Sequence, residues 1–472
     1  MVASSTWART PYTAAWPEGD RTGSLPLRRE EHRMSQWLES TFKLRELGTN
    51  PRTELIAGLT TFLTMAYIIV VNPQILGQAG VPFDGATFAT VMVAGLSSVL
   101  MGLMANLPIA VAPGMGLNAF FTFTLVLGLG LTWQQALGAI FLSGVVFLVI
   151  SLPGLNLREA IVRAVPAGVR LGVAAGIGLF LALIGMSGAG VVVASPATLV
   201  TFGGLTANLV LFVIGLVVAG LLLVRRVHGA LLISIVVTTL LTMLAQAFGW
   251  VEGVVFYPDR LVALPSLETV FALDIGGVLT ASVIGPVFAL LFTDMFDSIS
   301  TFVGVTKVAG LQEPDGTPKN VGKALLADAI STTFSGLVGS SSGTSYIESA
   351  AGVNAGGRSG LTAVVTGLLF LPFMFLSPLV GLIPSVATAP VLVLVGLFMM
   401  GALRDVDWND YENVIPAFVA LIAIPFTYSI TQGIVLSFLV YVLLKLVTGK
   451  ASEVPPVLWV IFLLSIVLLF QL

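Results

Sequence analysis

The sequence predicts an all-α polytopic membrane protein whose fourteen transmembrane spans form two inverted repeats of seven. Three observations lead to this fold class. Of the 472 residues, 56% are hydrophobic and only 10% are charged, whereas roughly 25% are charged in soluble domains. Apolar runs follow one another from Leu55 onward, and many have the length that a bilayer requires. Lysine and arginine fall in alternate connections between these runs.

The apolar runs define the order of the spans. They predict spans at 55–76, 86–105, 108–128, 134–153, 167–187, 206–224, 229–248, 279–303, 322–338, 342–356, 360–380, 387–403, 413–428 and 430–447. A last run, Val457 to Leu472, carries no charge. It is short for a span, so the sequence does not decide whether it crosses the bilayer.

The positions of all 21 Lys and Arg residues test this count. Only Arg260 falls in a connection on the opposite side from the others. Basic residues collect on the cytoplasmic side of membrane proteins. We therefore expect a multi-pass protein of the cell membrane with a cytoplasmic N-terminus. A miscount by one span in the middle of the chain would mix the two sides.

Two similar segments indicate the repeat. PAGVRLGVAAGIGLF begins at Pro166 and PSVATAPVLVLVGLF begins at Pro384, and each has Gly-Leu-Phe starting twelve residues after the proline. Seven spans separate the segments, so the second copy enters the membrane from the opposite side. Transporters with inverted repeats bind their substrates near the midplane, where the halves meet.

Composition excludes several kinds of site. The chain has no cysteine, which removes disulfide frameworks, iron–sulfur clusters and thiolate metal sites. Neither an HExxH zinc motif nor a GxxxxGK[ST] P-loop occurs. We therefore expect no cofactor and no ATP hydrolysis by a P-loop of this chain.

The stretch from Gly339 to Gly360, GSSSGTSYIESAAGVNAGGRSG, is the strongest candidate for a functional site. It lies between apolar runs, yet it is rich in Ser and Gly and carries Glu348. Irregular backbone at membrane depth is tolerated only inside protein or against a water-filled cavity, and an ionisable residue there indicates a site. The alternative is a polar packing seam between helices, where small residues are also common.

The inverted counterpart of this stretch is Ala112 to Thr124, APGMGLNAFFTFT, which contains Asn118. Both segments lie in the third span of their half. Two broken helices in corresponding positions are the best sequence indication of a transporter site. We expect half-helices whose N-termini face each other and offer free N–H donors.

Three further acids lie within predicted spans. Asp294 and Asp297 are three residues apart and therefore share a helical face. The alternative is a pair near water at a helix end, close to Lys307. Asp328 lies early in the ninth predicted span, where we expect a structural partner near the cytoplasmic side.

At these motifs the chain resembles the nucleobase:cation symporter-2 superfamily (nucleobase–ascorbate transporters), specifically its AzgA-like purine permease branch. The resemblance covers most of residues 48–448 and rests on NPRTELIAGLTTFLTMAYIIVVNP, APGMGLNAFF, TDMFDSISTF and TSYIESAAGVNAGGRSG. It implies a UraA-like fold with short β-strands leading into half-helices in spans 3 and 10. It also implies a core domain (53–153 and 271–380) and a gate domain (154–250 and 381–448). From the residues themselves we expect a polar cytoplasmic tail (1–52), in which the helical spacing of Trp37, Phe42 and Leu47 indicates an amphipathic surface helix, and a hydrophobic C-terminal tail (449–472).

The resemblance also assigns site residues. The acid of span 8 corresponds to Asp294, that of span 10 to Glu348, and the contact of span 3 to Asn118. The complete set expected to bind substrate is Asn118, Ala119, Phe120, Asp294, Thr344, Ser345 and Glu348. Asp297, Asp328 and Glu348 are expected to couple protons or to support the structure. Ser298 occupies the position where some superfamily members have histidine, so a histidine proton relay is not expected.

The expected function is import of adenine, guanine or hypoxanthine by proton symport, with the core domain moving against the gate domain. The alternatives are a uracil or xanthine carrier and an inorganic-anion carrier, and the acids argue against the latter. A membrane enzyme is a third class, but this chain lacks the set of His or Cys residues that would point to catalysis. The expected partners are a purine base, a proton and the lipid bilayer, without nucleic acid. The preferred purine, sodium coupling and a homodimer are left open.

Overall fold

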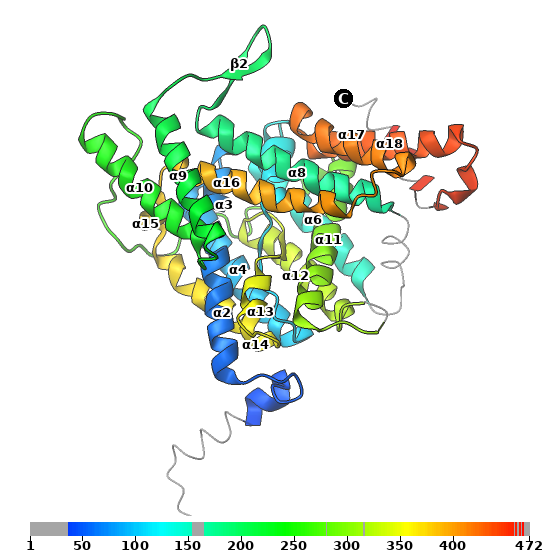
Figure 1. Cartoon of the computed structure of the whole chain (residues 1–472), viewed down its shortest axis with the longest axis horizontal. Coiled ribbons are helices and arrows are strands. Elements are labelled where there is room, and N and C mark those ends of the chain that lie inside the picture. The colour runs from blue at the N-terminus through cyan, green and yellow to red at the C-terminus, as the bar shows by residue number, and fades with distance from the viewer. Residues whose placement is uncertain are drawn as a thin grey trace, which may run out of the picture.

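The computed structural model describes residues 36–152, 165–279, 281–314 and 317–456, with parts of 458–466. Most of the described chain is helical and forms one bundle (Figure 1). Residues 36–42 form a helix where an amphipathic surface helix is predicted. Most of the N-terminal tail, the boundary between 153 and 154, and most of the run 457–472 lie outside the described residues.

The elements follow the chain in two halves. The first half contains α2 (Pro51–Met65), α3 (Ile68–Gln78), α4 (Phe83–Ala105), β1 (Val111–Pro113), α5 (Met115–Ala119), a π-helix (Phe120–Val126), α6 (Trp133–Ser151), α8 (Ala167–Gly188), β2 (Val192–Ser195), β3 (Leu199–Phe202), α9 (Ala207–Val224) and α10 (Ala230–Ala247). The second half contains α11 (Ala281–Ala309), α12 (Val321–Val338), β4 (Gly343–Ser345), α13 (Ser349–Asn354), α14 (Gly360–Phe370), α15 (Ser377–Gly381), α16 (Ser385–Met400), α17 (Tyr411–Thr427) and α18 (Ile430–Val447).

The described residues include nine helices that are long and apolar enough to cross a membrane, and three shorter apolar helices. These twelve match predicted spans. The other two predicted spans correspond to α12 and to β4 with α13, which carry Asp328 and Glu348. α12 has the length of a span but carries Lys323, Asp328 and several Ser and Thr residues, whereas α13 has only six residues and is too short. The polytopic helical fold is confirmed, whereas the count of fourteen crossings stays a prediction.

The inverted repeat brings equivalent residues of the two halves into contact. α8 packs against α16, and Gly178 and Gly396 approach each other reciprocally. A Cβ atom on Gly178 would lie 2.5 Å from the carbonyl oxygen of Gly396, and a Cβ atom on Gly396 would lie 2.3 Å from that of Gly178. Neither position has room for a side chain. These glycines begin the two Gly-Leu-Phe sequences, so the contact confirms the predicted repeat.

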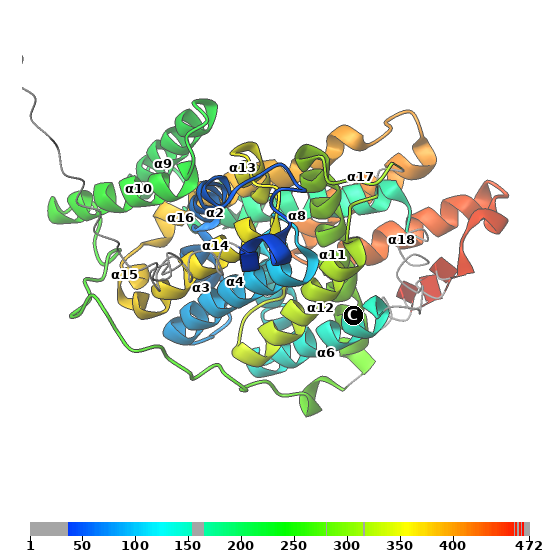
Figure 2. The ribbon, with the colours of Figure 1, turned by 90° about the horizontal axis from the view of Figure 1, so that it is seen from below.

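The other helix contacts recur in the same pattern. α4 packs against α14 as α12 packs against α6, and α9 packs against α10 as α17 packs against α18. Figure 1 and Figure 2 show the last two pairs at opposite edges of the bundle. Equivalent helices of the two halves therefore make equivalent contacts.

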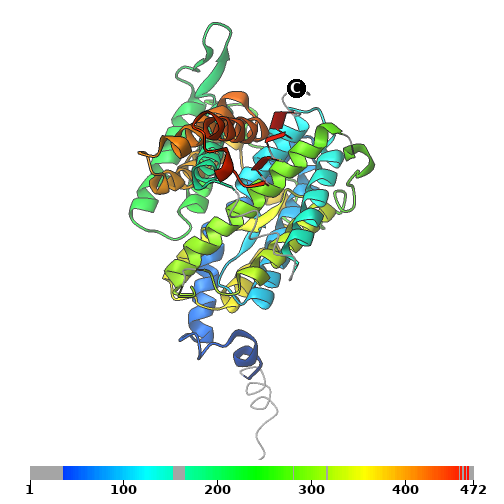
Figure 3. The same ribbon diagram turned by 90° about the vertical axis from the view of Figure 1, so that its right-hand side faces the viewer.

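A two-stranded antiparallel sheet of β1 and β4 lies inside the bundle (Figure 3). Val111 pairs with Ser345, Ala112 with Thr344, and Pro113 with Gly343, and every residue of both strands is buried. Each strand leads into a short helix, α5 or α13. The predicted strands and half-helices of spans 3 and 10 are confirmed.

A second hairpin, β2–β3, lies in the connection between α8 and α9 and was not predicted. It projects from the bundle (Figure 1), and β3 is exposed throughout. Leu199, the first residue of β3, has φ +68° and is 81% exposed. The predicted spans 167–187 and 206–224 leave this hairpin in the connection between them, where no strand was predicted.

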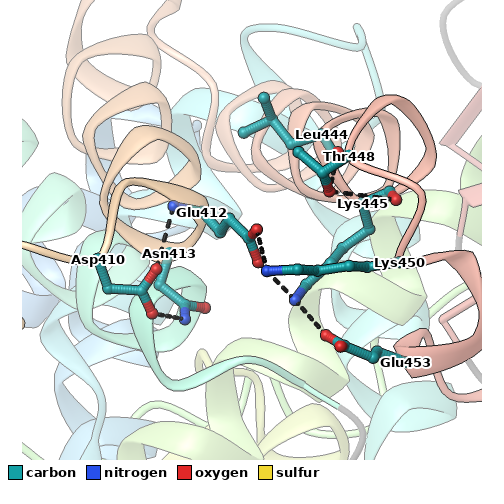
Figure 4. A network of polar contacts seen from close by, with 8 residues as sticks. All are labelled: Asp410, Glu412, Asn413, Leu444, Lys445, Thr448, Lys450 and Glu453. Atoms are coloured by element: carbon teal, nitrogen blue, oxygen red, sulfur yellow. Dashed lines mark hydrogen bonds and ion pairs between the residues drawn. The ribbon is translucent and has the colours of Figure 1, made fainter.

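A charge network joins the beginning of α17 to the end of α18 (Figure 4). The Nζ atom of Lys445 lies 2.7 Å from Glu412 Oε2 and 2.7 Å from Glu453 Oε2. Lys450 Nζ lies 2.5 Å from the other carboxylate oxygen of Glu412. The Lys445 side chain is only 10% exposed, and a largely desolvated cation requires paired carboxylates. Glu412 therefore links two helices and the segment that follows them.

We predict that Glu412→Gln destabilises the protein, because it removes the negative charge shared by Lys445 and Lys450. The measurement is thermal unfolding of the purified protein in detergent. The matched control is Glu46→Gln, which removes the exposed partner of Lys43 and should leave the unfolding temperature nearly unchanged. Equal unfolding temperatures for both variants would show that the network contributes no stability.

Candidate functional site

The crossing of β1 and β4 is held by backbone and side-chain hydrogen bonds between the two broken spans. Gly114 N donates to Ser342 O at 2.9 Å, and Tyr346 N donates to Ala110 O at 3.0 Å. The Tyr346 hydroxyl donates to Pro113 O at 2.5 Å. A Cβ atom on Gly114 would lie 2.4 Å from Thr344 Cγ2. The close approach therefore requires glycine at the start of α5.

Much of the polar stretch before β4 supports this crossing. The Ser335 hydroxyl accepts from Gly343 N at 2.9 Å. Asn72 of α3 donates to Ser340 at 3.1 Å and accepts from Ser341 at 3.4 Å. Asn72, Ser340 and Ser341 are fully buried. These serines pair with polar groups from other helices, as buried polar groups must.

Glu348 lies immediately after β4, at the N-cap of α13, and its side chain does not cap that helix. It is partly exposed. Its Oε1 accepts a hydrogen bond from the Tyr67 hydroxyl at 2.7 Å. Glu348 therefore lies where the strand ends and the half-helix begins, and its contact comes from the break between α2 and α3.

The three other acids lie on α11 and α12. Asp294 is fully buried, and its Oδ2 accepts from Thr332 at 2.5 Å. Asp328 is also fully buried and accepts hydrogen bonds from Ser298 and from Ser345, the latter at 3.1 Å. The structure therefore places Asp328 in direct contact with β4.

Asp297 lies on the same side of α11 as the strand. It is partly exposed, interacts electrostatically with Glu348, and is hydrogen-bonded to the Thr344 side chain. Thr344 also shares a 2.8 Å hydrogen bond with Ser298. The predicted residues Thr344 and Ser345 thus connect β4 to α11 and α12.

Asn118, Ala119 and Phe120 lie at the end of α5 and the start of the π-helix, and all three are fully buried. Among the described residues, Asn118 makes no hydrogen bond to any of the acids, and its Nδ2 lies 3.6 Å from Met115 Sδ. α5 packs against α11. The structure therefore brings this group beside the helix that carries Asp294 and Asp297.

Eleven buried side-chain oxygens of the described residues have no hydrogen-bond partner, and two of them, Asn118 Oδ1 and Asp294 Oδ1, belong to residues predicted to bind substrate. Unsatisfied buried acceptors are rare and indicate a functional requirement or a missing partner. The described residues hold no group of three or more His, Asp or Glu side chains that could bind a metal ion. The arrangement can accept hydrogen bonds from a ligand that carries N–H donors.

Sequence reasoning missed Tyr67, Asn72, Thr332 and Tyr346. Tyr67 and Asn72 carry a usable signal, because a tyrosine or asparagine inside an apolar run needs a partner for its polar group. Thr332 carries none, because threonine in a helix commonly bonds to its own backbone. Its contact with Asp294 depends on how α11 and α12 pack.

Comparison with known proteins places the chain among transporters. The model of a family described as "Permease family" matches residues 52–436. The adenine permease AdeP of Escherichia coli is 44% identical over 431 residues, which cover 91% of this chain and 95% of that protein. The guanine/hypoxanthine permease PbuO of Bacillus subtilis is 40% identical over 434 residues, covering 91% of this chain and 99% of that protein.

A solved structure shows the same fold at low sequence identity. The transmembrane domain of the bicarbonate transporter BicA from a cyanobacterium superposes with a TM-score of 0.61 at 16% identity, covering 80% of this chain and 96% of that one. At this identity the likeness concerns the fold alone. Together with the family match over most of the sequence, these findings show that the chain is a multi-pass transporter rather than an enzyme and belongs to the permease family of the nucleobase:cation symporter-2 superfamily, in its AzgA-like branch.

Proposed function

We propose that this permease imports purine nucleobases by proton symport. The observation that carries the proposal is the position of Glu348, a partly exposed acidic residue at the junction of β4 and α13. It is supported by relatives of 40–44% identity that are named adenine and guanine/hypoxanthine permeases. The preferred base among adenine, guanine and hypoxanthine is not part of the proposal.

The binding chemistry follows from the acceptors at the site. Purine bases carry ring N–H and exocyclic N–H donors, and Glu348 and Asp294 offer carboxylate oxygens. Pairing of a carboxylate with adjacent N–H donors combines favourable geometry with charge. Asn118 supplies an amide that can both donate and accept. Thr344, Ser345, Ala119 and Phe120 are the other residues assigned to the site.

Proton coupling is assigned to the acids that have no basic partner. Among the described residues, Asp297, Asp328 and Glu348 form no ion pair with Lys or Arg, and the side chains that hydrogen-bond to them carry hydroxyl groups. Hydroxyl groups can hydrogen-bond to a carboxylate and to a carboxylic acid alike. These acids can therefore change protonation without breaking a salt bridge.

The proposed movement divides the chain into a core domain (53–153 and 271–380) and a gate domain (154–250 and 381–448). Near the C-terminal end of α3, Gln74 accepts from Thr388 at 2.5 Å, across the proposed boundary. Phe123 packs edge-on against Phe180, with 5.8 Å between ring centroids. These contacts have to change if one domain moves as a rigid body against the other.

Two further contacts cross the same boundary close to the acids of α11. The guanidinium of Arg170 lies 5.4 Å from the ring centroid of Phe296, within the range of cation–π interactions. Phe292 packs edge-on against Phe438 of α18 at 6.1 Å. Phe292 and Phe296 flank Asp294 in the sequence, so a movement of α8 and α18 changes the surroundings of the acids.

A second candidate is transport of an inorganic anion, because the bicarbonate transporter BicA shares the fold. The acids at the site would repel an anion unless protonated. A uracil or xanthine carrier is the alternative within the family. Competition of labelled purine uptake by uracil, xanthine and bicarbonate separates the three.

We predict that Glu348→Gln lowers purine affinity about tenfold or more, because a hydrogen bond to a charged group contributes roughly 1.5–3 kcal/mol. Calorimetry with adenine, guanine and hypoxanthine on the purified protein measures this. Asp84→Asn, an exposed acid in the first turn of α4, is the control and should bind normally. Wild-type affinity in the Gln variant would remove Glu348 from the site.

We predict that a proton gradient drives uptake. Proteoliposomes with an acidic exterior should accumulate labelled purine in potassium buffer without sodium, and a protonophore should abolish accumulation while leaving exchange of labelled for unlabelled base. Accumulation that follows a sodium gradient at equal pH, with no response to the protonophore, would contradict proton coupling.

We predict different losses for the two acids of α11. Asp294→Asn should abolish transport and weaken binding, because Asp294 is assigned to the base. Asp297→Asn should slow transport with residual affinity closer to normal. Calorimetry and uptake on both purified variants decide the roles. The opposite pattern would assign the base to Asp297, which interacts electrostatically with Glu348.

A further inference from the structure

Tyr67 occupies an unusual place for a tyrosine. It lies between α2 and α3, where the first apolar segment is interrupted, and it is fully buried. Its hydroxyl donates to Glu348 Oε1 at 2.7 Å, a contact that spans 281 positions in the sequence. The described structure shows no other hydrogen bond of this hydroxyl. A buried tyrosine hydroxyl needs a polar partner, and here that partner is the proposed binding carboxylate.

A proline follows the interruption that places Tyr67. Pro73 lies within α3 and has no N–H group, so the carbonyl of Ile69 lacks its helical donor. The preceding turn is tightened: Ile69 N donates to Ala66 O at 3.2 Å, and Val70 N donates to Tyr67 O at 3.1 Å. This sequence, MAYIIVVNP, belongs to the first motif of the family resemblance, to which no function has been assigned so far.

A second buried tyrosine provides the contrast. Tyr346 also lies close to Glu348, but its hydroxyl donates to Pro113 O at 2.5 Å and so closes the strand crossing. Tyr346 therefore links the segment after β4 to the backbone of β1. Tyr67 is bonded to the side chain of Glu348 and to nothing that supports the crossing.

We propose that Tyr67 is a positioning residue that holds Oε1 of Glu348, so that the carboxylate presents Oε2 to a ring N–H of the bound base. The inference rests on the proposed function. A carboxylate at the N-cap of a short helix is free to rotate unless a second group fixes it. The hydroxyl from the α2–α3 break supplies that group, and the first apolar segment becomes part of the purine site without touching the base.

The orientation has a consequence for selectivity. A fixed carboxylate favours bases whose N–H lies in its plane, because hydrogen bonds weaken steeply as they bend. A freely rotating carboxylate can accept a hydrogen bond from N–H groups in several orientations, but it binds each of them more weakly. Tyr67 should therefore widen the difference in affinity between bases that carry the paired N–H and analogues in which a methyl group replaces it.

The test is calorimetric binding of adenine, hypoxanthine and guanine, and of their 7-methyl and 9-methyl analogues, to purified wild type, Tyr67→Phe and Tyr346→Phe. In Tyr67→Phe, affinity for the best parent base should fall about tenfold, because the unfixed Glu348 carboxylate no longer makes a well-aligned charged hydrogen bond to the ring N–H of the base. The affinity of the methyl analogue that binds most weakly should change little, so the ratio between the affinities of the parent base and this analogue becomes smaller. In Tyr346→Phe, all ligands should change by one common factor. Tyr67→His keeps an N–H donor, so its ratio of affinities should lie between those of wild type and Tyr67→Phe.

The inference is wrong if Tyr67→Phe keeps the wild-type range of affinities, or if it lowers all affinities equally as a structural change would. Thermal unfolding of each variant establishes that the protein being measured is folded. Failure of the proposed function looks different: in that case wild-type protein binds none of the bases. A wild type that binds them, together with a Tyr67→Phe variant of unchanged selectivity, rejects only the role of Tyr67.

Discussion

The pairing of β1 with β4 is the constraint on which the rest of the structure depends. Backbone N–H and C=O groups in the interior of a membrane protein must find partners within the protein. A helix that breaks in the middle of the bundle leaves several such groups unpaired, and the two broken spans satisfy each other in the ladder and in the bond from Gly114 to Ser342. The site forms where this mutual pairing ends and the half-helices begin.

The polar residues around the ladder divide into two roles. Asn72, Ser335, Ser340 and Ser341 pair with backbone or with one another and leave little to offer a ligand. Asn118 and Asp294 each keep a buried oxygen without a partner. Residues that support the ladder and residues proposed to bind substrate are therefore both buried, and burial alone does not distinguish the two roles.

The fold could be predicted from the sequence to a large extent, because it is encoded locally. Hydropathy places the spans within a few residues, and the Gly-Leu-Phe repeats mark two glycines that meet in space. Glu348 could be found because a carboxylate in an apolar region needs a reason. The contacts of Tyr67 and Thr332 could not, since each joins segments whose packing no local pattern encodes. The hairpin β2–β3 lies in the connection between two predicted spans, and β3 is exposed throughout, so no alternation of buried and exposed residues marks it as a strand.

The reciprocal contact of Gly178 and Gly396 has a consequence for how the two halves could diverge in evolution. The residues are equivalent in the repeat and meet backbone to backbone, so a methyl group on either one separates the same two helices. A gain of volume in one half cannot be offset by trimming the other, which is already at the minimum. At this point the two copies of the repeat constrain each other directly, and any side chain on either glycine requires the two helices to move apart.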